Sequence, residues 1–469
     1  MRYVSTRGEA PELDFEGVLL AGLARDGGLY VPAVWPRLDH AELRALAGRP
    51  YAEVAAYVLH PFMADWIGRD ELARITREAY ATFRHAAVAP LVQVKPGLFL
   101  LELFHGPTFA FKDVAMQVLS RLMQRALKRS GKRVTIVGAT SGDTGSAAIE
   151  AFRGLDNVDI FILHPKGRTS EVQRRQMTTV LDASVHNIAL EGSFDDCQAI
   201  VKALFSDHAL SDRLNLSGVN SINWGRIVAQ AVYYVTAAVA LGAPSRPVSF
   251  AVPTGNFGDV YAGYVAKRMG LPIDRLIVAT NTNDILARTH ETGRYEPKAM
   301  VPTQSPSMDI QVASNFERLL FDLAGRSADR VRGQMRSLAQ SGGFELTAAE
   351  LSGLRREIDA GRLDEAGTAR VMTGTYRATG EVLDPHTAVG IGVAESLAEN
   401  IHSPIVALAT AHPAKFPDAV KAALGRAPDA PERLVQVLKA EERYKVLPND
   451  VAKIAAFVSE RSRAGRDPA

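Results

Sequence analysis

The chain has 469 residues, more than a single hydrophobic core usually supports, so two or three domains with a cleft between them are expected. Hydrophobic residues make up 47% and charged residues 23%, which is typical of a soluble globular protein and excludes an intrinsically disordered chain. The formal net charge of +2 excludes a broad attraction to nucleic acid or to an anionic membrane. An anionic ligand must therefore be bound by local groups.

The single cysteine, Cys197, excludes an intrachain disulfide and a cysteine-based zinc site, and no metal site is expected. The first residues lack the apolar segment of a secretory signal, so the cytoplasm is the expected location. Residues 227–245 carry no formal charge, but Gln230 and Tyr233 interrupt the stretch, and its many alanines bury little area. This pattern predicts a buried interior helix rather than a membrane span.

Residues 1–92 predict a separate, mostly helical N-terminal domain with an early glycine turn. Beyond it, β-branched apolar runs alternate with helical patterns, which predicts parallel α/β units with right-handed crossovers. We expect one α/β domain over residues 93–230 and a second over residues 231–469. The predicted strands are residues 134–137, 160–163, 248–252, 276–279 and 405–409.

Three of these strands end in loops whose residues could carry chemistry, at positions 140–145, 253–259 and 410–413. In open α/β sheets ligands bind outside the carboxyl ends of the strands, so the three loops are expected to converge on one crevice. Gly255 lets the backbone approach an anion closely, and the helix expected after it supplies unpaired amides. This predicts a site for one phosphate, although a simple strand-to-helix turn explains the pattern equally well.

Neither nucleotide-binding glycine motif occurs at these loops, and the segment ending at Lys166 lacks the acid that would hold a ribose. Lys112 follows a run of aromatic residues and stands before a helix expected over residues 114–127. Both surroundings disfavour the ammonium form and favour the free amine that a Schiff base requires. A reactive lysine and a cradle for one phosphate are the two attachments that pyridoxal phosphate needs.

The sequence resembles the threonine synthases of the bacterial and fungal type, which belong to the fold-type-II pyridoxal-phosphate enzymes. The resemblance extends through nearly the whole chain, in residues 3–8, 26–32, 104–113, 140–145, 220–227, 255–259, 305–310, 384–390 and 410–416. It implies a tryptophan synthase beta-like fold, in which two α/β domains carry an added N-terminal domain. It also implies a lyase that converts O-phospho-L-homoserine and water into L-threonine and phosphate, by β,γ-elimination followed by β-addition.

The resemblance also implies roles for individual residues. Lys112 carries the cofactor and moves protons between substrate carbons, and Thr410 faces the pyridine nitrogen. Asp143 either lies beside the cofactor hydroxyl, where relatives often have asparagine, or caps the next helix through the amides of Thr144 and Gly145. The cofactor phosphate is expected on Gly255, Asn256, Phe257, Gly258 and Asp259. The substrate carboxylate is expected on Ser141, Gly142, Asp143 and Thr144. The candidates for the substrate phosphate are Arg226, Lys415, His412 and Arg7.

Three other functions fit parts of the same pattern. A phospholyase on this scaffold would release 2-oxobutyrate from O-phosphohomoserine, and a dehydratase acting on serine or threonine would need no substrate-phosphate site. A binding protein for phosphorylated amino acids would keep the loops but would not require Lys112. The resemblance implies a monomer or a weak dimer.

Overall fold

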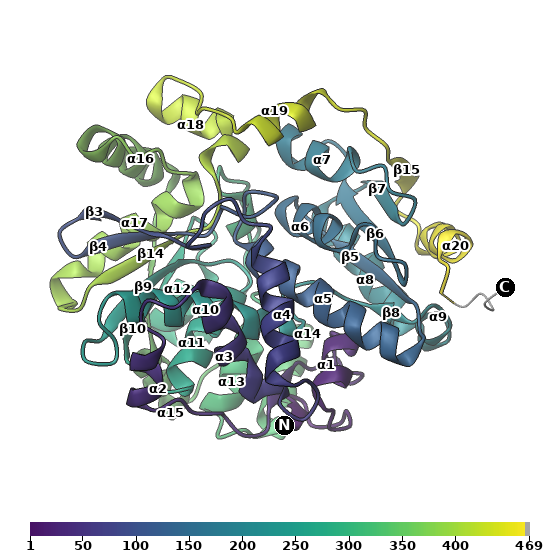
Figure 1. The fold of residues 1–469 in the computed structure, drawn as a ribbon, viewed down its shortest axis with the longest axis horizontal. Coiled ribbons are helices and arrows are strands. Elements are labelled where there is room, and N and C mark those ends of the chain that lie inside the picture. Colours follow the sequence, from purple (N-terminus) through teal and green to yellow (C-terminus); the bar gives the residue numbers. More distant parts are fainter. Residues whose placement is uncertain (465–469) are drawn as a thin grey trace.

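A computed structural model describes residues 1–464 of the chain. Two mainly parallel sheets, one of five strands and one of six, form two halves that lie side by side, with helices around both (Figure 1). The α/β class expected from the sequence is confirmed.

The N-terminal segment is mostly helical, and its two short strands pair with each other in antiparallel fashion. Its helix α2 begins with a capping box, in which Asp39 and Glu42 satisfy each other's backbone amides. The elements of this segment are β1 (Tyr3–Ser5), α1 (Phe15–Ala21), β2 (Tyr30–Pro32), α2 (His40–Ala45), α3 (Tyr51–Met63) and α4 (Arg69–Tyr80).

The five-stranded sheet has the order β15-β7-β6-β5-β8, and all its pairings are parallel. Strands β5 and β6 are buried along their whole length, as expected for strands covered by helices on both faces. This half contains α5 (Lys112–Ser130), β5 (Val134–Ala139), α6 (Asp143–Phe152), β6 (Val158–Pro165), α7 (Glu171–Thr178), β7 (Val185–Glu191), α8 (Phe194–Ser206), α9 (His208–Leu214), β8 (Leu216–Ser217), β15 (Lys445–Pro448) and α20 (Val451–Arg461).

The six-stranded sheet has the order β13-β10-β9-β14-β4-β3, and within it only the edge strand β3 runs antiparallel to its neighbour. Its strands are β3 (Leu91–Lys95), β4 (Leu98–Glu102), β9 (Val248–Pro253), β10 (Ile273–Thr280), β13 (Ile358–Arg362) and β14 (Ile405–Ala409). Its helices are α11 (Gly258–Arg268), α12 (Ile285–Thr292), α13 (Phe316–Leu323), α14 (Ala328–Ser341), α15 (Ala348–Glu357), α16 (Glu365–Thr379), α17 (Pro385–Leu397) and α18 (Pro417–Leu424). The next helix, α19 (Glu432–Lys439), packs against α7 of the five-stranded half. A small ribbon and three 3-10 turns complete the six-stranded half: β11 (Arg294–Tyr295), β12 (Phe344–Glu345), η1 (Pro306–Met308), η2 (Ala398–Asn400) and η3 (Pro413–Lys415).

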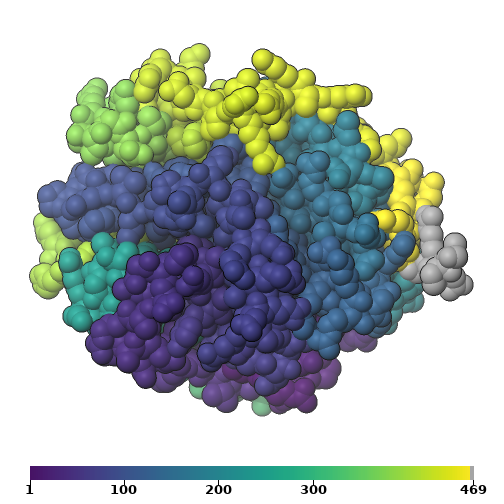
Figure 2. All heavy atoms as spheres, in the orientation of Figure 1, coloured from purple at the N-terminus to yellow at the C-terminus, as the bar shows by residue number. Residues whose placement is uncertain are grey.

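All five strands expected from the sequence are present, as β5, β6, β9, β10 and β14. Sheet membership, however, does not follow chain order. Strand β4 pairs with β14 although about 300 residues separate them, with Leu98 opposite Ile405. Strand β15 leaves the six-stranded half and pairs with β7, so that the C-terminal segment crosses the outer surface (Figure 2). The domain limits at residues 92 and 230 stay a prediction.

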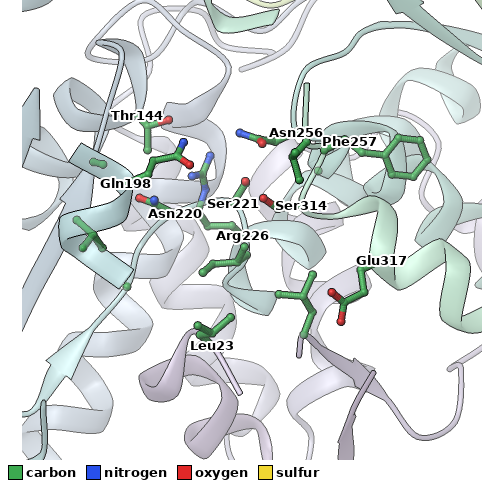
Figure 3. A pocket seen from close by; sticks show the side chains of 18 of the residues that line it. Leu23, Thr144, Gln198, Asn220, Ser221, Arg226, Asn256, Phe257, Ser314 and Glu317 are labelled. Carbon is green, nitrogen blue, oxygen red and sulfur yellow. The ribbon is translucent and has the colours of Figure 1, made fainter. Parts of the chain in front are cut away.

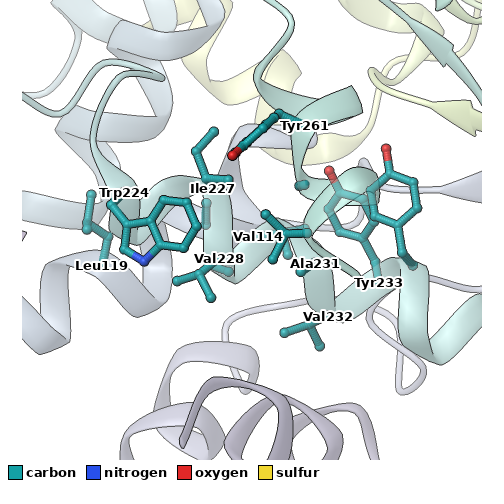
Figure 4. Close-up of a cluster of buried hydrophobic side chains, with 14 of the residues drawn as sticks. Val114, Leu119, Trp224, Ile227, Val228, Ala231, Val232, Tyr233 and Tyr261 are labelled. Atoms are coloured by element: carbon teal, nitrogen blue, oxygen red, sulfur yellow. The ribbon is translucent and has the colours of Figure 1, made fainter. Parts of the chain in front are cut away.

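Helix α10 (Trp224–Ala240) lies in the interior and packs against α3, α5 and α11. Its apolar side chains meet those of α5 in the cluster of Figure 4. The expectation of a buried helix from the uncharged stretch at residues 227–245 is confirmed. Among residues 1–464, no helix has both the length and the hydropathy required to cross a membrane.

Replacing Trp224 with alanine should strongly destabilise the protein. The indole is fully buried against the rings of Tyr3, Trp35 and Phe62, so the Trp224→Ala change would leave a large cavity. We expect the free energy of unfolding, measured by urea titration and circular dichroism, to fall by about 3–5 kcal/mol. Val34 is 70% exposed, and Val34→Ala should cost less than about 0.5 kcal/mol. Equal costs for the two changes would contradict this account of the core.

Candidate active site

A cavity of about 1270 Å³ lies where strands of both sheets end, and its polar lining is seen in Figure 3. The loops after β5, β9 and β14 all contribute to its wall, so the predicted convergence of three loops is confirmed. The predicted site residues in the wall are Lys112, Ser141, Asp143, Thr144, Arg226, Gly255, Asn256, Phe257, Gly258, Asp259 and Thr410. Arg7 also lines it.

Lys112 is the first residue of α5, and its side chain is buried at the cavity wall. The amine nitrogen lies 4.5 Å from the centre of the Phe111 ring and 3.4 Å from Oδ2 of Asp143. Burial lowers the pKa of Lys112, and the negative charge of Asp143 only partly opposes this effect. The environment therefore favours the free amine more than a surface position would, as the nucleophile of an imine requires.

Asp143 begins α6 and is held by two donors, the amine of Lys415 at 2.8 Å and the side-chain amide of Gln173 at 2.9 Å. Burial raises the pKa of the Asp143 carboxyl, but Lys415 and Lys112 outweigh burial and hold this pKa below its usual range. Asp143 is thus a buried carboxylate shared between two lysines.

The proposed cap of α6 by Asp143 through Gly145 is wrong. The hydroxyl of Thr140 accepts the amides of Gly142 and Gly145, both at 2.9 Å, so the Asp143 carboxylate is free to face the lysines. Gln173 was missed by the sequence analysis, because nothing in the local pattern of α7 links it to a loop 30 residues earlier. A Cβ atom at Gly142 would lie 2.4 Å from the Gln173 side chain, which explains the glycine.

The start of α11 provides a cradle for a phosphate group. Phe257 has a left-handed backbone with φ of 63°, and within the described residues no side chain caps the amides of the first turn. A Cβ atom at Gly255 would lie 2.5 Å from the carbonyl oxygen of Ser307, so only glycine permits this close approach. Uncapped amides at a helix start in a cavity wall suit an anion, and the residues present fit the phosphate of pyridoxal phosphate.

Asp259 lies in the first turn of the same helix, where an ionised carboxylate would repel a phosphate. The hydroxyls of Tyr233 and Tyr234 both donate to its Oδ1, whereas Oδ2 has no partner within residues 1–464. Burial raises the pKa of Asp259 to about 6. Asp259 is therefore protonated more easily than an ordinary carboxyl, and a neighbouring anion would raise its pKa further.

Arg226 lies in the first turn of α10 and is only 2% exposed. Its guanidinium donates to the carbonyl oxygen of Val219 at 3.2 Å, but its Nε has no partner, and across the described part of the chain no acid pairs with it. Burial lowers the pKa of Arg226 to about 10. A buried arginine without a counterion at a cavity wall indicates that an anionic ligand completes the site.

The other three cations proposed for a substrate phosphate have different surroundings. Arg7 forms two hydrogen bonds with Glu317, at 3.1 and 2.9 Å. The amine of Lys415 is fully buried and contacts Asp143 and the carbonyl oxygen of Thr108. Burial, followed by the nearby Arg84, lowers the pKa of His412 to about 4, so this ring is neutral at neutral pH. All four assignments stay predictions, and the surroundings favour Arg226.

Thr410 directly follows the strand β14 and lies next to the lysine segment. Its carbonyl oxygen accepts the amide of Phe111 at 2.8 Å, and Ala411 forms an isolated bridge with Ala110. The Thr410 side chain is almost completely buried and belongs to the cavity wall. Thr410 and Lys112 thus line the same cavity.

Two further residues of the wall, Ser307 and His386, received no role from the sequence. The Nδ1 atom of His386 lies 2.8 Å from Asp384, and its Nε2 accepts the amide of Ser307 at 3.2 Å. This contact supports the turn that lies against Gly255. The start of a helix at Asp384 and Pro385 could have indicated a fixed position for His386.

Three family descriptions match consecutive parts of the chain. Residues 2–80 match "Threonine synthase N terminus", residues 82–374 match "Pyridoxal-phosphate dependent enzyme", and residues 387–458 match "Threonine synthase, C-terminal". The fold of the central part is accordingly that of a fold-type-II pyridoxal-phosphate enzyme.

Individual relatives agree over the full length. A threonine synthase of Pseudomonas aeruginosa is 53% identical over 99% of this chain and 100% of its own. The crystal structure of pyridoxal-phosphate-bound threonine synthase from Brucella melitensis is 57% identical, with a TM-score of 0.94 over 99% of this chain and 100% of that one. Threonine synthase from yeast is 39% identical, with a TM-score of 0.92 over 98% of both chains. This chain belongs to the threonine synthase family of pyridoxal-phosphate-dependent enzymes.

Proposed function

We propose that this chain converts O-phospho-L-homoserine and water into L-threonine and phosphate, with pyridoxal phosphate attached to Lys112. The observation that carries the proposal is the presence, in one cavity, of a buried lysine, an uncapped helix start and a buried arginine without a counterion. The first two suit the cofactor. The third suits a second anionic group, which the phosphate of the substrate supplies.

Pyridoxal phosphate, when bound, supplies an electron sink that stabilises negative charge at carbons of the substrate. Residues 255–259 would hold its phosphate through backbone amides at the start of α11. The hydroxyl of Thr410 would serve the ring nitrogen and, as a neutral group, would leave that nitrogen unprotonated. Lys112 would take and return protons at the substrate carbons, since burial lowers the pKa of its amine and favours the free base.

The substrate has two anionic ends, and the cavity wall offers a place for each. The carboxylate is assigned to the start of α6, where the half-buried side chains of Ser141 and Thr144 line the cavity. The phosphate is assigned to Arg226, which lines the same cavity as Ser221 (Figure 3). Anchoring both ends fixes the reacting carbons between them, within reach of Lys112.

The phospholyase alternative would use the same residues and differ only in its product, because water would not add to the β-carbon. A dehydratase would leave Arg226 without a function. The cytoplasm as location, and a monomer or weak dimer as assembly state, remain part of the proposal. Light scattering of the purified protein would measure its assembly state.

Lys112→Ala should abolish turnover without unfolding the protein. We expect the wild-type protein with pyridoxal phosphate to release threonine and phosphate in equal amounts from O-phospho-L-homoserine. The variant should be slower by at least about 10²–10⁴-fold, the usual contribution of a positioned proton-transfer group. Lys128→Ala changes an exposed lysine in the last turn of the same helix and should leave the rate unchanged. Release of 2-oxobutyrate would establish the phospholyase, and absence of phosphate release would contradict both functions.

Arg226→Gln should raise KM for O-phospho-L-homoserine by about 10- to 100-fold, because a charge-assisted contact with the phosphate is lost. Binding of the cofactor, followed by its visible absorbance, should persist in this variant. Arg7→Gln is the matched comparison, since the Arg7 guanidinium is already bound to Glu317. A larger rise of KM in Arg7→Gln than in Arg226→Gln would assign the phosphate to Arg7 instead.

A further inference from the structure

The buried ion pair between Lys415 and Asp143 connects the two halves of the molecule. Asp143 begins α6 in the five-stranded half, whereas Lys415 belongs to η3, directly after β14 of the six-stranded sheet. Neither side chain is more than 4% exposed, and the nitrogen and oxygen lie 2.8 Å apart. Burying two charges costs free energy, so a pair at this position calls for an explanation beyond stability.

The two oxygens of the Asp143 carboxylate have separate partners. Oδ1 accepts from Lys415 and from Gln173, whereas Oδ2 faces the Lys112 nitrogen at 3.4 Å. Lys415 is in turn fixed by the carbonyl oxygen of Thr108, at 2.9 Å. Two cations thus share one acid, and the orientation of this acid toward Lys112 is set by Lys415 and Gln173.

The other charged groups near the Lys112 nitrogen are Arg226, Asp259 and Asp113, and none of them contacts it as Asp143 does. Arg226, on α10, lowers the pKa of Lys112 less than Lys415 does. Asp259, on α11, accepts hydrogen bonds from Tyr233 and Tyr234, and the positive charge of Lys112 lowers its pKa. Asp113, next in the chain, accepts the amide and hydroxyl of Thr108, both at 2.7 Å, and is directed away into that turn. Asp143 is the acid that contacts the Lys112 nitrogen.

We propose that the Lys415–Asp143 pair controls the charge of the Lys112 nitrogen in the cofactor-bound enzyme, with Asp143 acting on this nitrogen directly and Lys415 as its positioning residue. The inference rests on the proposed attachment of the cofactor to Lys112. A proton held on this nitrogen makes the attached carbon a better target for the incoming amine of the substrate, and Asp143 supplies the charge that holds it.

The two partners have opposite effects on the Lys112 nitrogen. Loss of the Asp143 charge removes an anion 3.4 Å away and should lower the pKa of the nitrogen, so that its proton is lost at lower pH. Loss of the Lys415 charge removes a nearby cation, and Lys112 is then the one lysine in contact with Asp143. Both effects should raise the pKa of the Lys112 nitrogen. A merely structural role for the pair would not produce shifts of opposite sign.

The test is a pH titration of the visible absorbance of the holoenzyme, which reports the charge of the cofactor-bound Lys112 nitrogen without turnover. Asp143→Asn, which keeps the size of the side chain, should lower the pKa by about 1–3 pH units. Lys415→Met should raise it, and Lys415→Arg should restore a value near that of the wild type. The double variant Asp143→Asn with Lys415→Met leaves neither member of the pair as an unpaired charge, and the pKa of its Lys112 nitrogen should lie below that of the wild type.

An Asp143→Asn titration that matches the wild type, or moves to higher pH, would overturn the proposal, as would shifts of the same sign in Asp143→Asn and Lys415→Met. If the single variants do not fold, a double variant with the wild-type titration would overturn it equally. Failure of the proposed function has a different result: the wild-type protein would gain no visible band with pyridoxal phosphate, or Lys112→Ala would gain the same band.

Discussion

The burial of the Lys112 amine beside an aromatic ring is the constraint that explains the neighbouring residues of the site. Lys112 is useful because burial favours its neutral form, but a fully uncompensated amine would be costly in this position. Asp143 supplies the compensation, and its own burial is supported by Lys415 and Gln173. Gly142 is required so that Gln173 can approach. The buried lysine thus requires the acid, the acid requires its two donors, and the approach of Gln173 requires the glycine.

The sheet topology makes these contacts possible. Parallel strands end at one edge of a sheet, and the loops after β5, β9 and β14 therefore face a common cavity although they come from two sheets. The pairing of β4 with β14 places the segment before Lys112 beside Thr410, with a hydrogen bond from Phe111. Helix α10 packs between the two halves and carries Arg226 at its start. The same long-range pairings that close the core thus assemble the site.

Local sequence patterns predicted the parts of this arrangement that depend on local physics. The β-branched runs predicted the strands, Gly255 predicted the tight turn before α11, and the uncharged stretch predicted the buried α10. Contacts between segments that lie far apart in the chain could not be predicted, because they produce no pattern in the local sequence. The addition of β15 to the five-stranded sheet is one case, and the position of Lys415 is another, since a lysine in a loop is usually solvated. The Asp143 cap failed because the Thr140 hydroxyl competes for the same amide.

The identity of residue 143 and that of residue 415 depend on each other. With asparagine at position 143, the fully buried Lys415 would have no acid to pair with, and an unpaired buried ammonium is far more costly than a paired one. With a neutral residue at position 415, Lys112 would be the one cation in contact with the Asp143 carboxylate among the described residues, and the whole charge of Asp143 would act on that nitrogen. Lys415 and Lys112 both lower the pKa of Asp143, so Lys415 favours the ionised carboxylate independently of the charge on Lys112.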